Sequence, residues 1–289
     1  MNPLPGILQS VAVSSESISP NTGPSLENVV FDPTYYGLTA LIIIVALTAA
    51  IFALRVRVKF NDQGQRARAT GTGLAALGFA IVFVGATSFL ALLRAGLLGG
   101  FLYQQAQFMI VYVGAAMMLY GVDRTVIPVA GIGSQSQRAG RETKLRAVLW
   151  IAFVVSVVIA VAYLFSPSTY TVTVSGATQH VAQQGAFWLP PFVTFAAGAV
   201  GLPVFALRGK DAAIRRHAMW FGLFFALELF GVLRESTLIP SSGDPFVDLL
   251  VAFIPFTAGG FCLIASAMSL PSTWLRQTTE LEAALHLPS

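Results

Sequence analysis

The chain has one cysteine, three histidines and few charged residues. Because Cys262 is alone, no disulfide can form within the chain and no thiolate metal site is expected. The histidines (His180, His217 and His286) fall in three separate predicted segments, which argues against paired axial ligands for haem and against a zinc site. We also find no Ser-His-Asp set, no paired carboxylates and no metal cluster. The sequence therefore predicts a protein that is not an enzyme.

Charged residues make up only 10% of the 289 residues, while hydrophobic residues make up 55%. Soluble domains carry about a quarter charged residues. A run of roughly 20 apolar residues spans a hydrocarbon core of about 30 Å, and seven such runs are present. The expected fold class is all-α integral membrane, with seven transmembrane helices. We place them near 36–57, 71–93, 103–122, 147–166, 187–207, 217–238 and 248–270.

Lysine and arginine are distributed asymmetrically among the connecting segments. Fifteen of the seventeen fall in connectors on one side of a seven-span arrangement, which predicts that this side is cytoplasmic and the N-terminus outside. The cations are spread over short loops, which favours anionic lipid headgroups and not nucleic acid as partners. The fifteen are Arg55, Arg57, Lys59, Arg66, Arg68, Arg124, Arg138, Arg141, Lys144, Arg146, Arg208, Lys210, Arg215, Arg216 and Arg276.

The charge pattern also predicts three regions in a multi-pass protein of the cell (plasma) membrane. Residues 1–35 form an extracytoplasmic arm that lacks lysine, arginine and a compact apolar run, so no cleavable signal peptide is expected. Residues 36–270 form the bundle and 271–289 a cytoplasmic tail. Alternating β-branched and small polar residues predict a hairpin in the outer loop 166–186, and glycines predict a flexible inner loop at 131–141.

Similar segments recur in the two halves of the chain. Phe-Ala-Leu-Arg at 52–55 recurs at 205–208, Leu-Arg at 93–94 recurs at 233–234, and the spacing of Phe108 and Gly114 recurs in Phe253 and Gly259. These matches predict a 3+1+3 parallel repeat in which helices one to three correspond to helices five to seven. The alternative is chance similarity between apolar helices.

The 3+1+3, N-outside plan resembles that of SWEET-type sugar carriers and microbial rhodopsins. The carriers use a proline in both repeats, whereas Pro190, Pro191, Pro203 and Pro255 all fall in the second half of this chain. Rhodopsins attach retinal to a lysine of the seventh helix. The lysines here (Lys59, Lys144 and Lys210) all lie in predicted inner loops. No retinal Schiff base and no other cofactor is therefore predicted, and bound lipid or pigment stays open.

Glu228 falls near the centre of the sixth predicted span. A carboxyl at that depth is costly unless it is protonated, paired or hydrated, so it marks a functional candidate. The repeat matches it with Ser88, and it matches Tyr112 with Thr257 at similar depth. These four residues are predicted to form a polar site at the membrane midplane. The alternative is that Glu228 is a protonated carboxyl that serves packing through one interhelical hydrogen bond.

Two further groups of charged residues are candidates. Arg94, Arg234, Glu235 and Asp248 are predicted to form an outer ion network, or alternatively the two arginines form the mouth of an anion site. Asp123 and Arg124 form a predicted inner ionic pair at the end of the third span. With Thr125 they resemble the Asp-Arg-Tyr ionic lock of the largest class of G-protein-coupled receptors, although helix ends commonly carry such a pair.

Aromatic residues and glycines within the spans indicate how the helices pack. The tryptophans lie near predicted interfaces, as in an aromatic belt. Small residues permit close approach of helices, and the glycines that can do so are Gly78, Gly85, Gly114, Gly198, Gly259 and Gly260.

The expected partners are membrane lipids and other membrane subunits, or a second copy of this chain. We expect a complex subunit or receptor-like component, with a small-solute or ion carrier as the alternative.

Overall fold

The computed structural model describes residues 33–60, 63–94, 101–126, 135–164, 169–174, 177–182, 188–208, 212–233 and 245–270. In these ranges the chain forms seven α-helices and one two-stranded hairpin. Residues 1–32 of the predicted arm and the predicted tail lie outside the described residues. The helices are α3 (Pro33–Arg57), α4 (Gln63–Arg94), α5 (Phe101–Val126), α6 (Gln135–Leu164), α7 (Leu189–Arg208), α8 (Ala212–Leu233) and α9 (Pro245–Ser269).

Five of the helices in the described ranges have the length and composition of membrane spans. The shortest, α7, has 20 residues, which corresponds to about 30 Å. Five helices contain a segment long and apolar enough to cross a bilayer, and α9 contains a shorter apolar segment at Phe253–Ser269. The chain is therefore built as a helical membrane protein. The five segments are Tyr36–Arg57, Gln63–Gly85, Thr143–Ala162, Leu189–Leu207 and Ala212–Leu233.

One helix corresponds to each predicted span, but two helices begin eight or more residues earlier than expected. Helix α4 begins at Gln63, ahead of the predicted start at 71. The prediction of a flexible loop at 131–141 is wrong from Gln135 onward, because α6 begins there. The first turns of α6 contain Gln, Arg, Ala, Glu and Lys, which are strong helix formers. A helix can continue in this way beyond the apolar segment, where hydropathy gives no signal.

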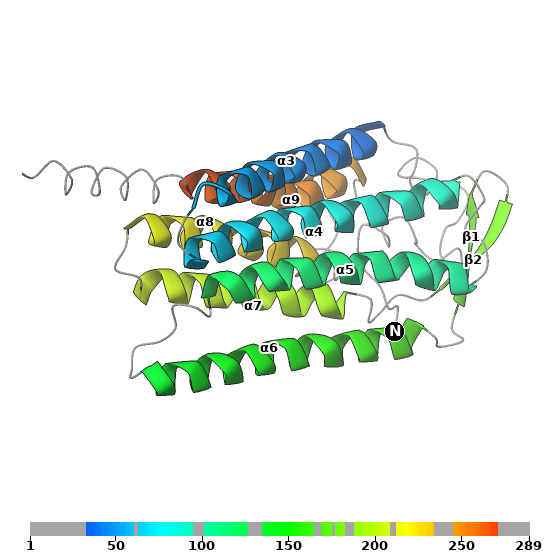
Figure 1. Cartoon of the computed structure of the whole chain (residues 1–289). Coiled ribbons are helices and arrows are strands. Elements are labelled where there is room, and N and C mark those ends of the chain that lie inside the picture. The colour runs from blue at the N-terminus through cyan, green and yellow to red at the C-terminus, as the bar shows by residue number, and fades with distance from the viewer. Residues whose placement is uncertain are drawn as a thin grey trace, which may run out of the picture.

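Six of the seven helices form a ring, and α6 lies outside it. Around the ring α3, α4, α5, α7, α8 and α9 each pack against the next, and α9 closes on α3. Helix α6 packs mainly against α7 and slightly against α5, and Figure 1 shows it along one side of the bundle. Only 17% of its apolar segment is buried inside the protein, compared with 61% for α4. The ring is therefore the structural core, and α6 is an addition to it.

A hairpin connects α6 to α7, which confirms the hairpin predicted in 166–186. Strand β1 (Thr169–Val174) pairs antiparallel with β2 (Ala177–Ala182), and Val174 lies opposite Ala177. The link between them, residues 175–176, is the two-residue length typical of tight hairpins. The β2 strand contacts α5, and Figure 1 shows the hairpin at one end of the bundle.

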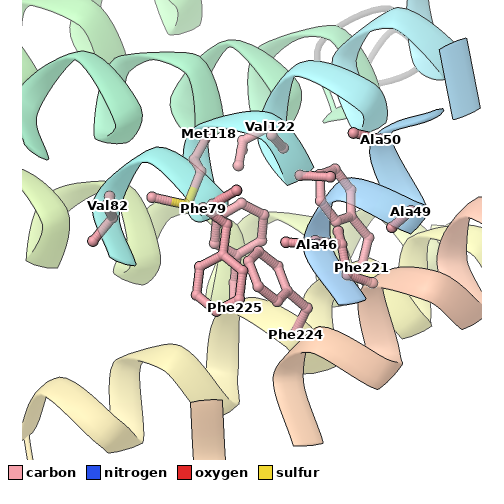
Figure 2. Packing of buried hydrophobic residues seen from close by; sticks show 14 of the residues in the cluster. Ala46, Ala49, Ala50, Phe79, Val82, Met118, Val122, Phe221, Phe224 and Phe225 are labelled. Carbon is pink, nitrogen blue, oxygen red and sulfur yellow. The ribbon is translucent and has the colours of Figure 1, made fainter. Parts of the chain in front are cut away.

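Phenylalanine rings fill the centre of the bundle (Figure 2). The Phe79 ring meets Phe83 and Phe224 edge to face, with centroids 5.0 Å apart in both pairs. The Phe224 ring meets Phe225 at 4.8 Å, and Phe83 meets Phe256 at 5.3 Å. Each such pair contributes about 0.5–1.5 kcal/mol beyond the burial of its surface. These contacts join α4, α8 and α9 into one apolar core.

Glycines bring the backbones of α4 and α5 into direct contact. A side chain at Gly78 would collide with the carbonyl of Gly114, and one at Gly114 with the carbonyl of Gly78. Nearer the other end of the same interface, Gly71 and Gly121 meet in the same way. The predicted close approach is confirmed at Gly78 and Gly114, and the second pair was missed. Seven-residue spacing keeps each helix's glycines on one face.

Candidate functional site

The buried carboxyl group of Glu228 lies between α8 and α9. Its side chain is fully buried, and a Cβ on Gly259 would collide with its Oε1. The same added Cβ would also meet the ring of Phe224, one turn along α8. A glycine at position 259 therefore provides the space in which the carboxyl group packs against the α9 backbone.

The other three members of the predicted midplane site occupy separate places. The Ser88 hydroxyl donates a hydrogen bond to the Gly85 carbonyl within α4, at 2.9 Å. Tyr112 is buried in α5. Thr257 precedes Gly259 by two residues, which is about 200° around α9 from the contact with Glu228. A site formed by all four residues stays a prediction.

The helix contacts favour a different correspondence between the two halves. Gly114 of α5 packs against Val82 of α4, as well as against Gly78. At the repeat-related position of α9, Gly259 packs against Glu228 and, four residues earlier, against Phe224. Gly114 thus contacts residues 78 and 82 of α4, and Gly259 contacts residues 224 and 228 of α8. Aligning these two pairs matches Glu228 with Val82 and not with Ser88.

Two of the four residues of the predicted outer network lie in described helices. Arg94 lies in α4 and Asp248 in α9, whereas Arg234 and Glu235 lie outside the described residues. The side chains of all four are outside the described part of the structure. The network and its alternative, an anion mouth, therefore stay predictions.

The opposite end, which we call the basic end, carries Arg55 and Arg57 in the last turn of α3, and Arg215 and Arg216 near the start of α8. There Asp123 of α5 pairs with Arg146 of α6, with Oδ1 and Nε 2.8 Å apart. The Asp123 side chain is 2% exposed and that of Arg146 is 40% exposed. The guanidinium of Arg124 instead lies over the Tyr120 ring, 4.7 Å from its centroid. Consecutive helical residues point in different directions, so the carboxylate finds its partner on another helix.

A cluster of polar side chains surrounds His217, which is 1% exposed in α8. Its Nδ1 lies 3.0 Å from both the carbonyl and the hydroxyl oxygen of Ser266 in α9. Its Nε2 lies 3.4 Å from the hydroxyl of Thr72 in α4. That hydroxyl also donates to the carbonyl of Arg68 at 2.9 Å. The cluster therefore connects three helices, and no local sequence pattern indicates it.

If the predicted repeat is applied at this end of the bundle, contacts in the two halves fall at matching positions. Gly121 of α5 contacts Gly71 of α4, and at the related positions Ser266 of α9 contacts His217 of α8. A pair of glycines in the first half thus has a polar pair as its counterpart. No sequence signal joins the members of this pair, because they meet only through helix packing.

The described residues contain no group of three or more His, Cys, Asp and Glu that could hold a metal ion. Cys262 is buried in α9 as a free thiol. No protein-family model and no curated protein matches this chain. Among the polar groups described above, the Asp123–Arg146 pair and the His217 cluster each connect one helix to another.

Proposed function

We propose that the chain is a non-enzymatic heptahelical protein of the cell membrane that acts through partners, as a subunit of a larger assembly or as a receptor-like component. All seven helices cross the membrane in this proposal, with the N-terminus outside and the basic end in the cytoplasm. The observation that carries it is the packed aromatic centre of the helix ring.

The aromatic centre argues against a solute path through the ring. Phe224 contacts both Phe79 and Phe225 and lies one turn from Glu228. Closely packed interiors resist the rearrangement that a central path would require. A bundle packed in this way suits a scaffold or receptor component, whose function lies in its contacts with other molecules.

The basic end supports the proposed orientation. Its described cations are mostly exposed, and basic residues next to spans remain on the cytoplasmic side. Exposed cations beside the spans can also meet anionic lipid headgroups. The exposed residues are Arg55, Arg57, Lys59, Arg66, Lys144, Arg215 and Arg216.

The alternative is a small-solute or ion carrier built on the repeat, and two observations favour it. Glu228 is a fully buried carboxyl group within an apolar helix, a position that commonly marks a transport or proton pathway. The ring also has matching neighbours in its two halves: α3 contacts α9 as α7 contacts α5. This is the pattern expected from a parallel repeat of three helices.

One experiment compares the two functions. The wild-type chain and Glu228→Gln are purified from the native membrane in mild detergent and analysed by native mass spectrometry, thermal melting and solute uptake in liposomes. We expect co-purifying polypeptides at fixed stoichiometry in both preparations. We expect the free energy of unfolding to change by under about 1 kcal/mol, since glutamine has the same shape as glutamate and can also form hydrogen bonds.

The carrier alternative predicts the reverse combination. Wild-type protein would then catalyse uptake without any other polypeptide, and Glu228→Gln would lose uptake while melting normally. A lone, uptake-competent polypeptide would therefore reject the partner proposal. Leu227→Ala, at a half-buried neighbour of Glu228, controls for a general loosening of α8.

A further inference from the structure

Contacts between neighbouring helices recur in the two halves of the ring at constant sequence intervals. Gly85 of α4 packs against Val111 of α5, and Gly231 of α8 packs against Phe256 of α9. Residues of α8 thus follow their counterparts in α4 by 146 positions, and residues of α9 follow those in α5 by 145. The other α4–α5 and α8–α9 contacts described above have the same intervals. These contacts give a residue-by-residue correspondence between the two helix pairs.

Helices α3 and α7 correspond in the same way. Both contain Phe-Ala-Leu-Arg near their ends, and the two copies lie 153 positions apart. At this interval Ala50 corresponds to Pro203. Ala50 lies beside Gly73 of α4, and Pro203 lies beside Gly222 of α8, within one turn of the position that corresponds to Gly73. The interval read from the sequence therefore agrees with the packing of the helices.

Helix α7 has one neighbour more than α3. Helix α3 packs against α4 and α9, and α7 packs correspondingly against α8 and α5. Helix α7 also packs against α6, whereas among the described helices α3 has no third neighbour with comparable contact. Figure 1 shows α3 and α9 together on the side of the bundle away from α6. Positions that are covered in α5 and α7 but exposed in α9 and α3 therefore mark the surface that corresponds to the binding surface of α6.

Exposed side chains on α3 include a stripe whose counterparts on α7 are covered. Ile44 is 61% exposed, and Ala40 and Thr48 are exposed one turn to either side of it. Spacing by four residues places the three on one face of the helix. The stripe borders α9, because Val45 next to it packs against Gly260 of that helix. The half-buried counterparts on α7 are Val193, Ala197 and Gly201.

Exposed side chains on α9 lie at the positions that α6 covers on α5. Arg146 of α6 contacts Asp123 of α5, which is 2% exposed. The counterpart of Asp123 on α9 is Met268, which is 62% exposed. The same difference separates two earlier pairs on this face: Met109 and Ala116 of α5 are half-buried, and Ile254 and Phe261 of α9 are exposed. We call the surface formed by Ala40, Ile44, Thr48, Ile254, Phe261 and Met268 the α3–α9 face.

The α3–α9 face differs in charge from the surface that binds α6. On α5 the carboxylate of Asp123 receives the Arg146 cation of α6, whereas Met268 takes the place of that carboxylate on α9. The charged residue on this face is Arg55 of α3, which is exposed and lies about three turns beyond Ile44 on the same side of the helix. Arg55 takes part in no ion pair among the described residues. An acidic group is therefore the complement of the α3–α9 face at the basic end.

We propose that the α3–α9 face binds one membrane-spanning helix of a partner protein, as α5 and α7 bind α6. The contact of Asp123 with Arg146 places the end of α5 beside the first half of α6, so α6 runs antiparallel to α5. The bound helix correspondingly runs antiparallel to α9, and its first turn lies at the basic end. It is apolar along its length and carries acidic side chains in that first turn, where they meet Arg55 and are also favoured by the helix dipole.

The chemistry of the face selects a different protein over a second copy of this chain. The most exposed helix of a second copy, α6, has the cations Lys144 and Arg146 at the end that would lie beside Arg55. Like charges oppose that arrangement. This inference rests on the proposed function, since it names the kind of partner through which the protein acts.

The test measures energy transfer between the full chain and a synthetic helix in phosphatidylcholine liposomes. The synthetic helix has a Leu-Ala span of about 20 residues, an acceptor dye, and either two glutamates or two lysines at its N-terminus. The donor dye is attached at Val58→Cys, a 77% exposed position after α3, in a Cys262→Ala background. We expect saturable transfer with the glutamate peptide and about fivefold weaker binding of the lysine peptide, as for one exposed ion pair.

Variants of the face test where the helix binds. Arg55→Gln should bring the two peptides to within about twofold of each other. Thr48→Trp and Met268→Trp should abolish saturable transfer, because an indole on the face excludes a closely packed helix. Leu47→Trp is the matched control, since Leu47 is exposed about 100° around α3 from Thr48, as its counterpart Val200 is on α7. It should bind the peptide like the wild-type protein.

Three results would overturn the proposal. The first is transfer no greater than random mixing gives, with either peptide. The second is equal binding by Thr48→Trp and Leu47→Trp, and Met268→Trp on the other helix replaces Thr48→Trp if that variant does not fold. The third is transfer between donor- and acceptor-labelled copies that Thr48→Trp abolishes, which would show that a second copy covers the face. If polypeptides still co-purify with the native protein, failure of this test rejects the α3–α9 face as their contact and leaves the partner proposal standing.

Discussion

Gly114→Ala is expected to destabilise the bundle by about 1–3 kcal/mol, and Gly114→Val by more, as found when a packed interior is overfilled. The added Cβ would collide with the backbone carbonyl of Gly78 and would also meet the Val82 side chain. A carbonyl cannot turn away as a flexible side chain can, so α4 and α5 would have to separate. The measurement is the melting temperature of the purified protein in detergent.

Gly37→Ala in α3 is the control for the change from glycine to alanine. No atom lies within 4 Å of a Cβ at that position. Its effect should therefore be neutral or slightly stabilising, because alanine favours a helix by up to about 1 kcal/mol over glycine. If Gly114→Ala melted at the same temperature as Gly37→Ala, the two backbones would not be in contact.

Substituting either member of the ion pair between α5 and α6 should destabilise the protein, and the two substitutions should do so by different amounts. Arg146→Gln leaves the buried Asp123 carboxylate without its guanidinium, and we expect a loss of about 2–3 kcal/mol. This is below the range for fully buried pairs, since Arg146 is partly exposed. Asp123→Asn leaves an arginine that can reach water, and we expect about 1 kcal/mol. Chemical or thermal unfolding measures both losses.

The double variant separates pairing from other effects. Asp123→Asn combined with Arg146→Gln should cost clearly less than the sum of the single losses, because the second change removes the charge that the first one strands. Arg124→Gln is the control, since its described contact is with the Tyr120 ring of the same helix and should be worth about 1 kcal/mol. Additive single effects would contradict the pairing.

The helices could be predicted because an apolar run of about 20 residues is typical of a membrane-spanning helix. The start of α6 could not, because the turns from Gln135 onward are polar and a helix that extends into water leaves no trace in hydropathy. The hairpin was predictable from β-branched residues on both sides of a Ser-Gly link.

Only some features of the candidate sites could be predicted from the sequence. Glu228 was recognisable as a carboxyl group in an apolar run, and its burial is confirmed. The sequence suggested Arg124 as the partner of Asp123 because the two are adjacent, whereas the partner in the structure is 23 residues away. His217 meets residues 49 and 145 positions away. Contacts at such separations follow from helix packing, which local patterns do not encode.

The correspondence between the halves depends on the same distinction. Matching the helix ends paired Glu228 with Ser88, whereas matching the contacts at Gly114 and Gly259 pairs it with Val82. Helix ends vary with the loops that follow them, but a close contact between two backbones fixes their relative position. Contacts are therefore the better guide to which residues correspond.

The orientation of a seven-span bundle is the central claim, because it decides which side the basic end and the hairpin face. It is tested by attaching a reporter whose activity depends on its compartment, either after Ser289 or between the two strands at residue 175. The account predicts activity only in the cytoplasm for the first fusion and only outside for the second. Activity of both fusions on the same side of the membrane would contradict it.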